Sequence, residues 1–259
     1  MRKLRFIYEM NLRFEEPVWD HSFSLRCVPA SDEVQKVTIE SRYIYPTDCL
    51  DETIDGFGNH KYIGHYHEYH KQFGYEIAGV AEVEGMKLRH EPLQEWYKYP
   101  SSLTRPGKKL HEYLSSKKFP EGNALERAGY LMRGLYRDFR YVPGKTDIST
   151  TAEEAMEKGY GVCQDYAHIF ITLLRMAGIP ARYVNGLMIG EGCTHAWVEL
   201  YTGEGWYGLN PTNNLHVDDY YIKLAHGRDY NDCVLDKGTF RGCPGQTQHV
   251  QVIVEEIKE

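Results

Sequence analysis

The stretch GYGVCQDYAHIFITLLRMAGIPARY, residues 159–183, decides the fold of the second part of the chain. Its apolar residues recur at helical spacing from Cys163 onward, and Gly178 followed by Pro180 is the usual signal that ends a helix. We therefore expect a helix that begins at Cys163, directly after a glycine-rich turn. Because free cysteine is among the most buried residue types, Cys163 taken alone is more simply interpreted as a packing residue.

Composition limits the classes of protein that this chain can belong to. It has 259 residues, of which 42% are hydrophobic, enough for one large domain or two ordinary ones. The net charge is −7 and no basic block occurs, which argues against nucleic acid or an anionic membrane as the main partner. The N-terminus lacks an apolar signal segment, so we expect a cytoplasmic protein without a spanning helix. Six cysteines without a CxxC pair indicate neither a disulfide scaffold nor a structural zinc site.

The periodicity of the apolar residues changes along the chain. In residues 1–95, short alternating runs separated by Pro, Asp, Gly and Asn predict an N-terminal antiparallel β-sandwich. Prolines gather between roughly 90 and 110 and indicate a boundary there. Residues 96–259 form the second predicted domain, which includes the C-terminal strands. Because helical segments precede alternating ones there, we expect an α+β fold, with helices at 123–141, 149–159 and 163–178, and strands at 181–190, 194–202, 205–212 and 249–257.

Three residues of the second domain have the properties of a cysteine-nucleophile site. The start of a helix favours a thiolate at Cys163, although the charge of Asp165 opposes it unless that carboxylate caps the helix instead. His195 begins a predicted strand and supplies an imidazole. Asn210 ends the next predicted strand, and a hairpin between the two strands would bring it close to His195. The pattern indicates a nucleophile, a base and a residue that orients the base.

Three blocks of this sequence, GYGVCQDYAHIFITLLRMAGIPARYVNG, THAWVEL and GWYGLNPTNN, resemble the transglutaminase-like core, a branch of the papain-like cysteine enzymes. Residues 1–90 resemble the β-rich domain that precedes this core in bacterial members. The resemblance implies that Cys163 is the nucleophile, His195 its base and Asn210 the orienting residue. Asn210 departs from the commoner pattern, in which an aspartate precedes the Pro-Thr. Asparagine can hold the imidazole tautomer but cannot stabilise an imidazolium with a full charge.

The implied activity is acyl transfer through a thioester on Cys163. Such chemistry leads to a cysteine peptidase or amidase acting on a peptide or protein, and it needs no metal or organic cofactor. Two alternatives stay open: protein-glutamine crosslinking by the same residues, and a catalytically silent binding or scaffold module with the same fold. The sequence does not decide the oligomeric state. The expected cleft walls are Tyr160, Gly161, Trp197 and Tyr207.

Histidines are concentrated in the stretch GNHKYIGHYHEYHKQ of the first domain. If this stretch is a strand, His65 and His67 share one face, and a metal site there is one interpretation. A half-exposed strand is the simpler interpretation, because its tyrosines alternate with polar residues. A second pair, Cys193 and His195, lacks the remaining ligands that a metal would need.

Overall fold

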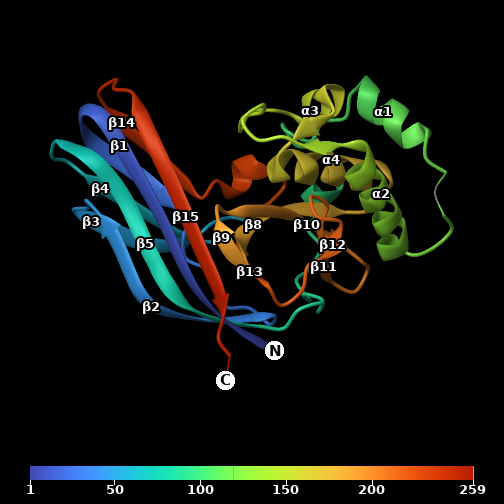
Figure 1. Ribbon diagram of the computed structural model, residues 1–259, viewed down its shortest axis with the longest axis horizontal. Helices are drawn as coiled ribbons and strands as arrows, with labels where there is room; N and C mark the ends of the chain where they lie inside the picture. Colours follow the sequence, from blue (N-terminus) through green and yellow to red (C-terminus); the bar gives the residue numbers. More distant parts are fainter. Residues whose placement is uncertain (119, 259) are drawn as a thin grey trace.

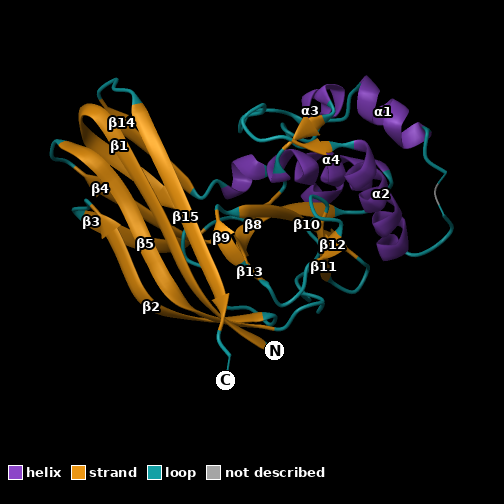
Figure 2. Ribbon diagram, viewed as in Figure 1, coloured by secondary structure: helices purple, strands orange, loops and turns teal. Residues whose placement is uncertain are grey.

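The computed structural model describes residues 1–118 and 120–258. Figure 1 shows two parts side by side: a long twisted sheet that ends near both chain termini, and a smaller sheet with helices packed on it. Figure 2 shows that the helices gather in the second part. The expected mixture of α and β structure is therefore confirmed. None of the described helices is both long and apolar enough to cross a lipid bilayer.

The large sheet has eight strands in the order β2-β5-β1-β15-β9, with β14 and β4 also paired to β1 and β3 paired to β4. Its strands are β1 (Arg2–Leu25), β2 (Gln35–Tyr45), β3 (Cys49–Ile54), β4 (His60–Tyr66), β5 (His70–Val83), β9 (Gly190–Gly192), β14 (Asp236–Arg241) and β15 (Gln246–Glu256).

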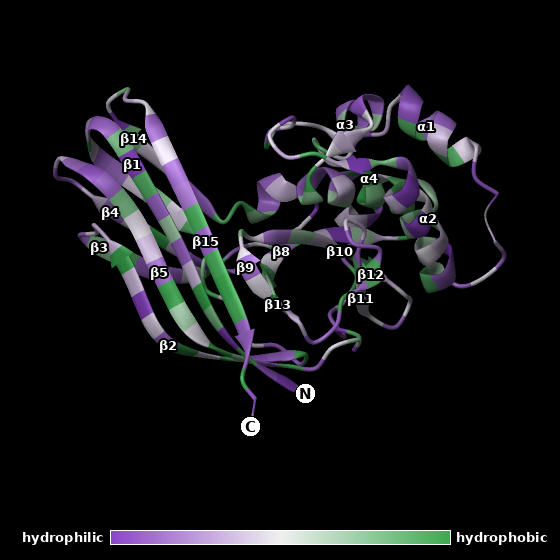
Figure 3. Cartoon of the chain, in the orientation of Figure 1, coloured by the Kyte–Doolittle hydropathy of each residue, from purple (hydrophilic) through white to green (hydrophobic). Residues whose placement is uncertain are grey.

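Strand β1 organises this sheet. Every second residue at its start is buried, as a strand with one face on the core requires, and Figure 3 shows hydrophobic and hydrophilic residues interleaved along the long strands. The pairing of β1 with β5 shifts between Arg13 and Val18, around Pro17, which has no N–H to give to a ladder. Beyond that point β1 pairs with β4 and β14 instead. Because one continuous strand belongs to both arms of the sheet, the predicted sandwich is not confirmed.

The C-terminal strands differ from the sequence-based assignment to residues 96–259. Strands β14 and β15 pair with β1, and β15 also pairs with β9, so they complete the N-terminal sheet. Pairing between segments at opposite ends of a chain leaves no local signal in the sequence. The boundary near residue 95 stays a prediction.

The smaller sheet has the order β12-β11-β10-β8-β13. Its strands are β8 (Ala181–Met188), β10 (His195–Tyr201), β11 (Trp206–Asn210), β12 (Leu215–His216) and β13 (Tyr221–Gly227). A separate parallel pair consists of β6 (Arg140–Tyr141) and β7 (Tyr160–Gly161). The smaller sheet carries two of the candidate site residues, His195 on β10 and Asn210 on β11.

The helices are α1 (Lys108–Ser115), α2 (Ala124–Asp138), α3 (Ala152–Lys158) and α4 (Cys163–Met176), with 3-10 turns η1 (Glu95–Lys98) and η2 (Tyr230–Cys233). Three helices, α2, α3 and α4, lie within the predicted helical segments, whereas α1 was not predicted. Asn123 caps α2, and the left-handed Gly159 ends α3. Helix α4 is buried on nearly all sides from its third residue and packs against β8 and β10. It therefore holds Cys163 at a fixed place beside the sheet.

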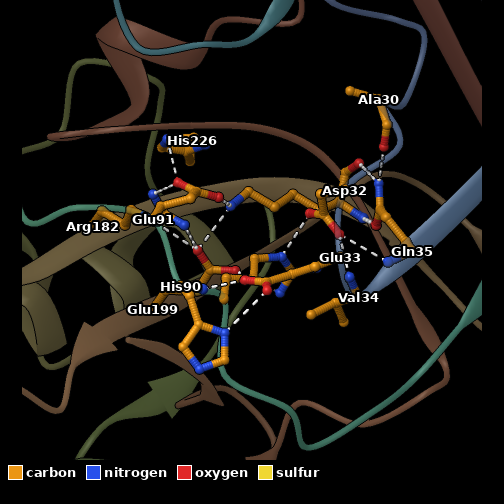
Figure 4. Close-up of polar contacts among 12 residues, drawn as sticks. Ala30, Asp32, Glu33, Val34, Gln35, His90, Glu91, Arg182, Glu199 and His226 are labelled. Atoms are coloured by element: carbon orange, nitrogen blue, oxygen red, sulfur yellow. Dashed lines mark hydrogen bonds and ion pairs between the residues drawn. The ribbon is translucent and has the colours of Figure 1, made fainter. Parts of the chain in front are cut away.

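A buried charged cluster joins the smaller sheet to the segments that precede it. The Glu199 carboxylate of β10 accepts hydrogen bonds from Arg89 at 3.0 Å, Arg182 at 2.7 Å and Lys223 at 2.9 Å. Figure 4 shows Glu199 and Arg182 in this cluster, with Asp32 on its far side. Burial raises the pKa of Glu199, but the neighbouring cations hold it well below its usual value. The cluster fixes β8, β10 and β13 relative to one another.

Candidate active site

Cys163 is the first residue of α4, as predicted, and Val162 is the N-cap. The Asp165 carboxylate turns back and accepts the N–H of Val162 at 2.7 Å and the hydroxyl of Thr146 at 2.7 Å. Asp165 therefore caps the helix, and its charge also acts on the nearby thiol. Gly161 makes this arrangement possible, because a Cβ there would lie 2.4 Å from the Asp165 Oδ2.

The surroundings of the Cys163 thiol do not favour a thiolate in this conformation. Burial raises the pKa of Cys163, while the backbone N–H groups of Ala196, Gln164 and Cys163 itself oppose that rise. The charge of Asp165 raises it further, and the pKa ends above its ordinary value. The expectation that the helix start lowers this pKa is therefore wrong, because desolvation outweighs the backbone donors. A neutral thiol needs a base to remove its proton before it can attack.

His195 is the residue that the sequence predicts as this base. It is the first residue of β10 and pairs with Gly186 of β8. Burial lowers the pKa of His195, and the side chain of Asn210 opposes that shift. The Nε2 atom of His195 is buried and makes no hydrogen bond with any described group. A neutral imidazole of lowered pKa is able to accept a proton without first losing one.

The predicted hairpin exists and brings Asn210 to His195. Strands β10 and β11 pair antiparallel, with Val198 opposite Leu209. Continuing this register places Asn210 opposite Trp197, diagonally across from His195 and on the same face of the sheet. The three residues singled out from the sequence thus lie on a helix start, a strand start and a neighbouring strand end.

The side chain of Asn210 is fully buried, and both its amide oxygen and its amide nitrogen make hydrogen bonds. Its Oδ1 accepts the backbone N–H groups of Thr212 at 3.1 Å and Asn213 at 3.3 Å, and its Nδ2 donates to the Tyr221 hydroxyl at 2.9 Å. The two backbone donors fix which amide atom is the oxygen. Hydrogen bonding to the Asn210 side chain is what opposes the fall in the His195 pKa that burial causes.

Cys163 and His195 border the same cavity. It has a volume of about 210 Å³, and its other walls include Tyr141, Met188 and Cys193. His195 and Tyr141 also border a neighbouring cavity of about 470 Å³. A reacting group in the smaller cavity can therefore contact the thiol and the imidazole together.

The N-terminal sheet forms one side of a third cavity next to the thiol. This space of about 250 Å³ is bordered by Cys163 and Asn185 from the core and by Tyr8 and Val250 from β1 and β15. The thiol thus lies between the two parts of the molecule. Any molecule that reaches Cys163 from this side contacts both parts.

The expected cleft walls turn out differently. Trp197 is only 1% exposed and packs against Val184 and Tyr221, so it belongs to the core. Tyr207 is also buried, and its hydroxyl forms a hydrogen bond with His216 Nδ1 at 3.0 Å. Neither residue borders the three cavities described above, nor does Tyr160. Large aromatic residues on strands face the core unless an opening in the sheet exposes them.

Tyr141 is the cavity residue that the sequence analysis missed. It follows α2 in the short strand β6, pairs with Gly161 and is 54% exposed. Burial of its hydroxyl raises the pKa of Tyr141, and the nearby thiols of Cys163 and Cys193 raise it further. The available signal was an aromatic residue between a helix end and the turn sequence VPG.

Comparison with protein families agrees with this arrangement of elements. Residues 111–211 match the family model described as the transglutaminase-like superfamily, and residues 4–82 match the one described as the bacterial transglutaminase-like N-terminal region. The first match contains Cys163, His195 and Asn210. The second covers β2 to β5 and most of β1.

Individual relatives share these segments. The chain is 39% identical over 125 residues to an uncharacterized protein of Mycobacterium leprae, covering 44% of either chain. It is 32% identical over 213 residues to an uncharacterized protein of Mycobacterium tuberculosis, covering 69% of this chain and 68% of that one. The chain thus spans less than half of the first relative's length. A solved structure from Cytophaga hutchinsonii, provisionally named a cysteine protease, has the same fold with a TM-score of 0.77, 19% identity and coverage of 100% of this chain and 91% of that one.

Proposed function

The chain belongs to the transglutaminase-like superfamily, and on that premise we propose that it is a cysteine peptidase or amidase. Its nucleophile would be Cys163, its general base His195 and its positioning residue Asn210. The substrate would be a peptide or protein amide. The observation that supports this best is that Cys163 and His195, each the first residue of its element, border one cavity of about 210 Å³.

The raised pKa of Cys163 and the lowered pKa of His195 support a mechanism in which both groups start neutral. His195 takes the thiol proton as Cys163 Sγ attacks the amide carbonyl, which forms the C–S bond and an oxyanion. Backbone N–H groups of the first turn of α4, including that of Cys163, are available to the oxyanion. The intermediate then collapses: the C–N bond breaks and the imidazolium returns its proton to the leaving amine. In the second half of the reaction His195 takes a proton from a water molecule that attacks the thioester carbonyl. The C–S bond breaks, the carboxylic acid leaves and His195 returns the proton to Cys163 Sγ.

Mass spectrometry of peptide mixtures tests the proposal. The full chain is incubated with a mixed peptide pool, with and without a small primary amine, and new termini and conjugates are counted. We expect cleavage that Cys163→Ala abolishes and that His195→Ala reduces by about 10²-fold or more. Cys243→Ala is the matched control, because Cys243 is exposed and borders none of the three cavities.

Other outcomes distinguish the alternatives. Amine conjugates in place of cleaved peptides would replace hydrolysis with crosslinking by the same thiol. Products that persist in Cys163→Ala, or no product from a folded parent protein, would refute catalysis by this thiol and leave a binding role. Unfolding curves of the parent and of Cys163→Ala show whether the variant keeps its fold.

A further inference from the structure

A second cluster of reactive side chains lies in the N-terminal sheet, apart from the cavity of Cys163. Asp20 of β1, His65 of β4 and His67 just after β4 offer one ligand atom each, and these three atoms lie within 4.8 Å of one another. His65 Nε2 lies 3.0 Å from His67 Nδ1, and His67 Nδ1 lies 3.3 Å from Asp20 Oδ1. The third side of this triangle, from His65 Nε2 to Asp20 Oδ1, is 4.0 Å.

The size of this triangle matches a metal ion. A point equidistant from its three corners lies about 2.0 Å from each, which is the length of a Zn–N or Zn–O bond. In a tetrahedral zinc site with such bonds, ligand atoms are about 3.3 Å apart, close to the mean of the three sides. The ligand atoms therefore need little movement to bind an ion.

Neighbouring groups hold the ligands in this orientation. Ser22 Oγ forms a 2.8 Å hydrogen bond with His65 Nδ1, which leaves Nε2 directed to the cluster, as outer partners of metal-binding histidines do. Arg241 binds the other oxygen of Asp20, Oδ2, at 3.0 Å and leaves Oδ1 available. The backbone N–H of His67 donates to Asp48 at 2.8 Å.

The backbone of Asp20 is also unusual. Its φ is +48°, a left-handed value that non-glycine residues seldom adopt, and it lies where the pairing of β1 with β14 shifts. Its N–H donates to the carbonyl of His67 at 3.3 Å. The same two residues that supply ligand atoms are thus joined through the main chain. Strained backbone that is held in place by its neighbours is a common property of binding sites.

We propose that Asp20, His65 and His67 bind a divalent transition metal of the zinc class, with water as the fourth ligand. Two imidazoles and one carboxylate suit Zn²⁺, whereas Mg²⁺ and Ca²⁺ prefer sets made only of oxygen ligands. The ion joins β1 to the turn after β4. It takes no part in the reaction proposed for Cys163, so the two proposals stand or fall separately.

Calorimetric titration of the full chain with Zn²⁺ tests this site. Exposed thiols are first blocked with iodoacetamide, because thiolates have affinity for zinc and Cys49, Cys193 and Cys243 are free and exposed. We expect one saturable site, an unfolding midpoint that rises with Zn²⁺ concentration and no response to Mg²⁺. His65→Ala and His67→Ala each weaken binding by more than about 10-fold, and Ser22→Ala by about 10-fold through loss of the outer partner.

Controls keep the test decisive. His60→Ala removes a histidine from the same strand that lies outside the cluster, and it should bind as the parent does. His67 is 69% exposed, so His67→Ala is expected to fold. With Co²⁺ in place of zinc, the spectrum should show no thiolate charge-transfer band. Zinc binding that is unchanged in His67→Ala, or no saturable binding to the parent protein, would overturn the proposal.

Discussion

At the scale of single residues, the candidate site combines a thiol of raised pKa with an imidazole of lowered pKa. Both groups are neutral near pH 7, in contrast to the thiolate that the start of a helix favours in the sequence analysis. The main cause is burial, which opposes charge on either group. Catalysis then depends on proton transfer at the moment of attack, so small changes in nearby charge should have measurable effects.

Alkylation of Cys163 reports its pKa directly. We expect iodoacetamide to modify exposed Cys49 and Cys193 before Cys163 near neutral pH, and Cys163 to react fast only above about pH 9. Asp165→Asn should move the Cys163 profile to lower pH by less than about one unit, because it removes a negative charge but keeps an acceptor for Val162. Mass spectrometry of modified peptides measures the rates. A Cys163 that reacts first at neutral pH in the parent would contradict the raised pKa.

Asn210 allows a complementary test of the imidazole. Asn210→Asp places a carboxylate where Thr212 and Asn213 already donate N–H groups, and the Tyr221 hydroxyl can rotate to donate as well. The added charge should raise the pKa of His195 by about one unit or more. The shift is measured by NMR titration of the His195 ring, with Asn213→Asp as the exposed control. A His195 pKa that does not move would separate Asn210 from the imidazole.

Among the secondary-structure elements, β8, β10 and β13 are held in their relative positions by the side chain of Glu199. Its carboxylate is fully buried beneath three cationic side chains, those of Arg89, Arg182 and Lys223. Glu199→Gln leaves these cations without their main counter-charge and should cost about 3–5 kcal/mol of unfolding free energy. Urea denaturation measures this cost.

A surface pair provides the control for Glu199. Glu95 forms an exposed pair with Lys98 at 2.7 Å, so Glu95→Gln should change the unfolding free energy by less than about 1 kcal/mol. Equal effects of the two substitutions would show that Glu91 and Asp32 suffice to balance the buried cations.

Local signals predicted α2, α3 and α4, because a helix is specified by neighbours in the sequence, whereas α1 was not predicted. Asn123 and Glu126 form a capping box at the start of α2, and Gly159 has the left-handed φ of +73° that ends α3. The hairpin of β10 and β11 was likewise predictable, because a four-residue turn, residues 202–205, joins the two strands. Candidate residues on these elements could therefore be placed from sequence.

Features that depend on distant contacts could not be predicted. The pairing of β15 with β1 joins the two ends of the chain, and the burial of Trp197 depends on Gly186, where a Cβ would lie 2.3 Å from the indole ring. The pKa of Cys163 depends on how deeply α4 is covered, which no local pattern records. Alternation of residues tells which face of a strand a side chain occupies, but not what covers that face.

At the scale of the whole molecule, the return of the C-terminal strands makes the two parts one unit. Strand β15 completes the N-terminal sheet and also contributes Val250 to the cavity beside Cys163. The apolar core likewise continues from β1 into α4. Destabilisation of either part should therefore disturb the site, and unfolding is best measured on the full chain.

Buried neutral histidines predict how this stability depends on pH. Burial lowers the pKa of His168 to about 4, with Asp229 opposing and Arg175 adding to the shift. Burial and the cations Lys223 and Arg182 hold the pKa of His226 well below its usual value. Both side chains bind a proton near pH 6.5 when unfolded but not when folded, so acidification favours the unfolded chain.

The unfolding free energy should accordingly fall as the pH drops from about 6.5 toward 4, by roughly 3 kcal/mol per pH unit for two protons. His168 Nε2 accepts the N–H of Tyr230 at 3.2 Å, and His168→Gln offers an amide oxygen for that bond without a titratable group. Urea unfolding at about pH 7, 6 and 5 gives the slope of the unfolding free energy against pH. In this variant that slope should be smaller by the contribution of one proton. If parent and variant have equal slopes, His168 is already charged in the folded protein, and burial does not control its protonation.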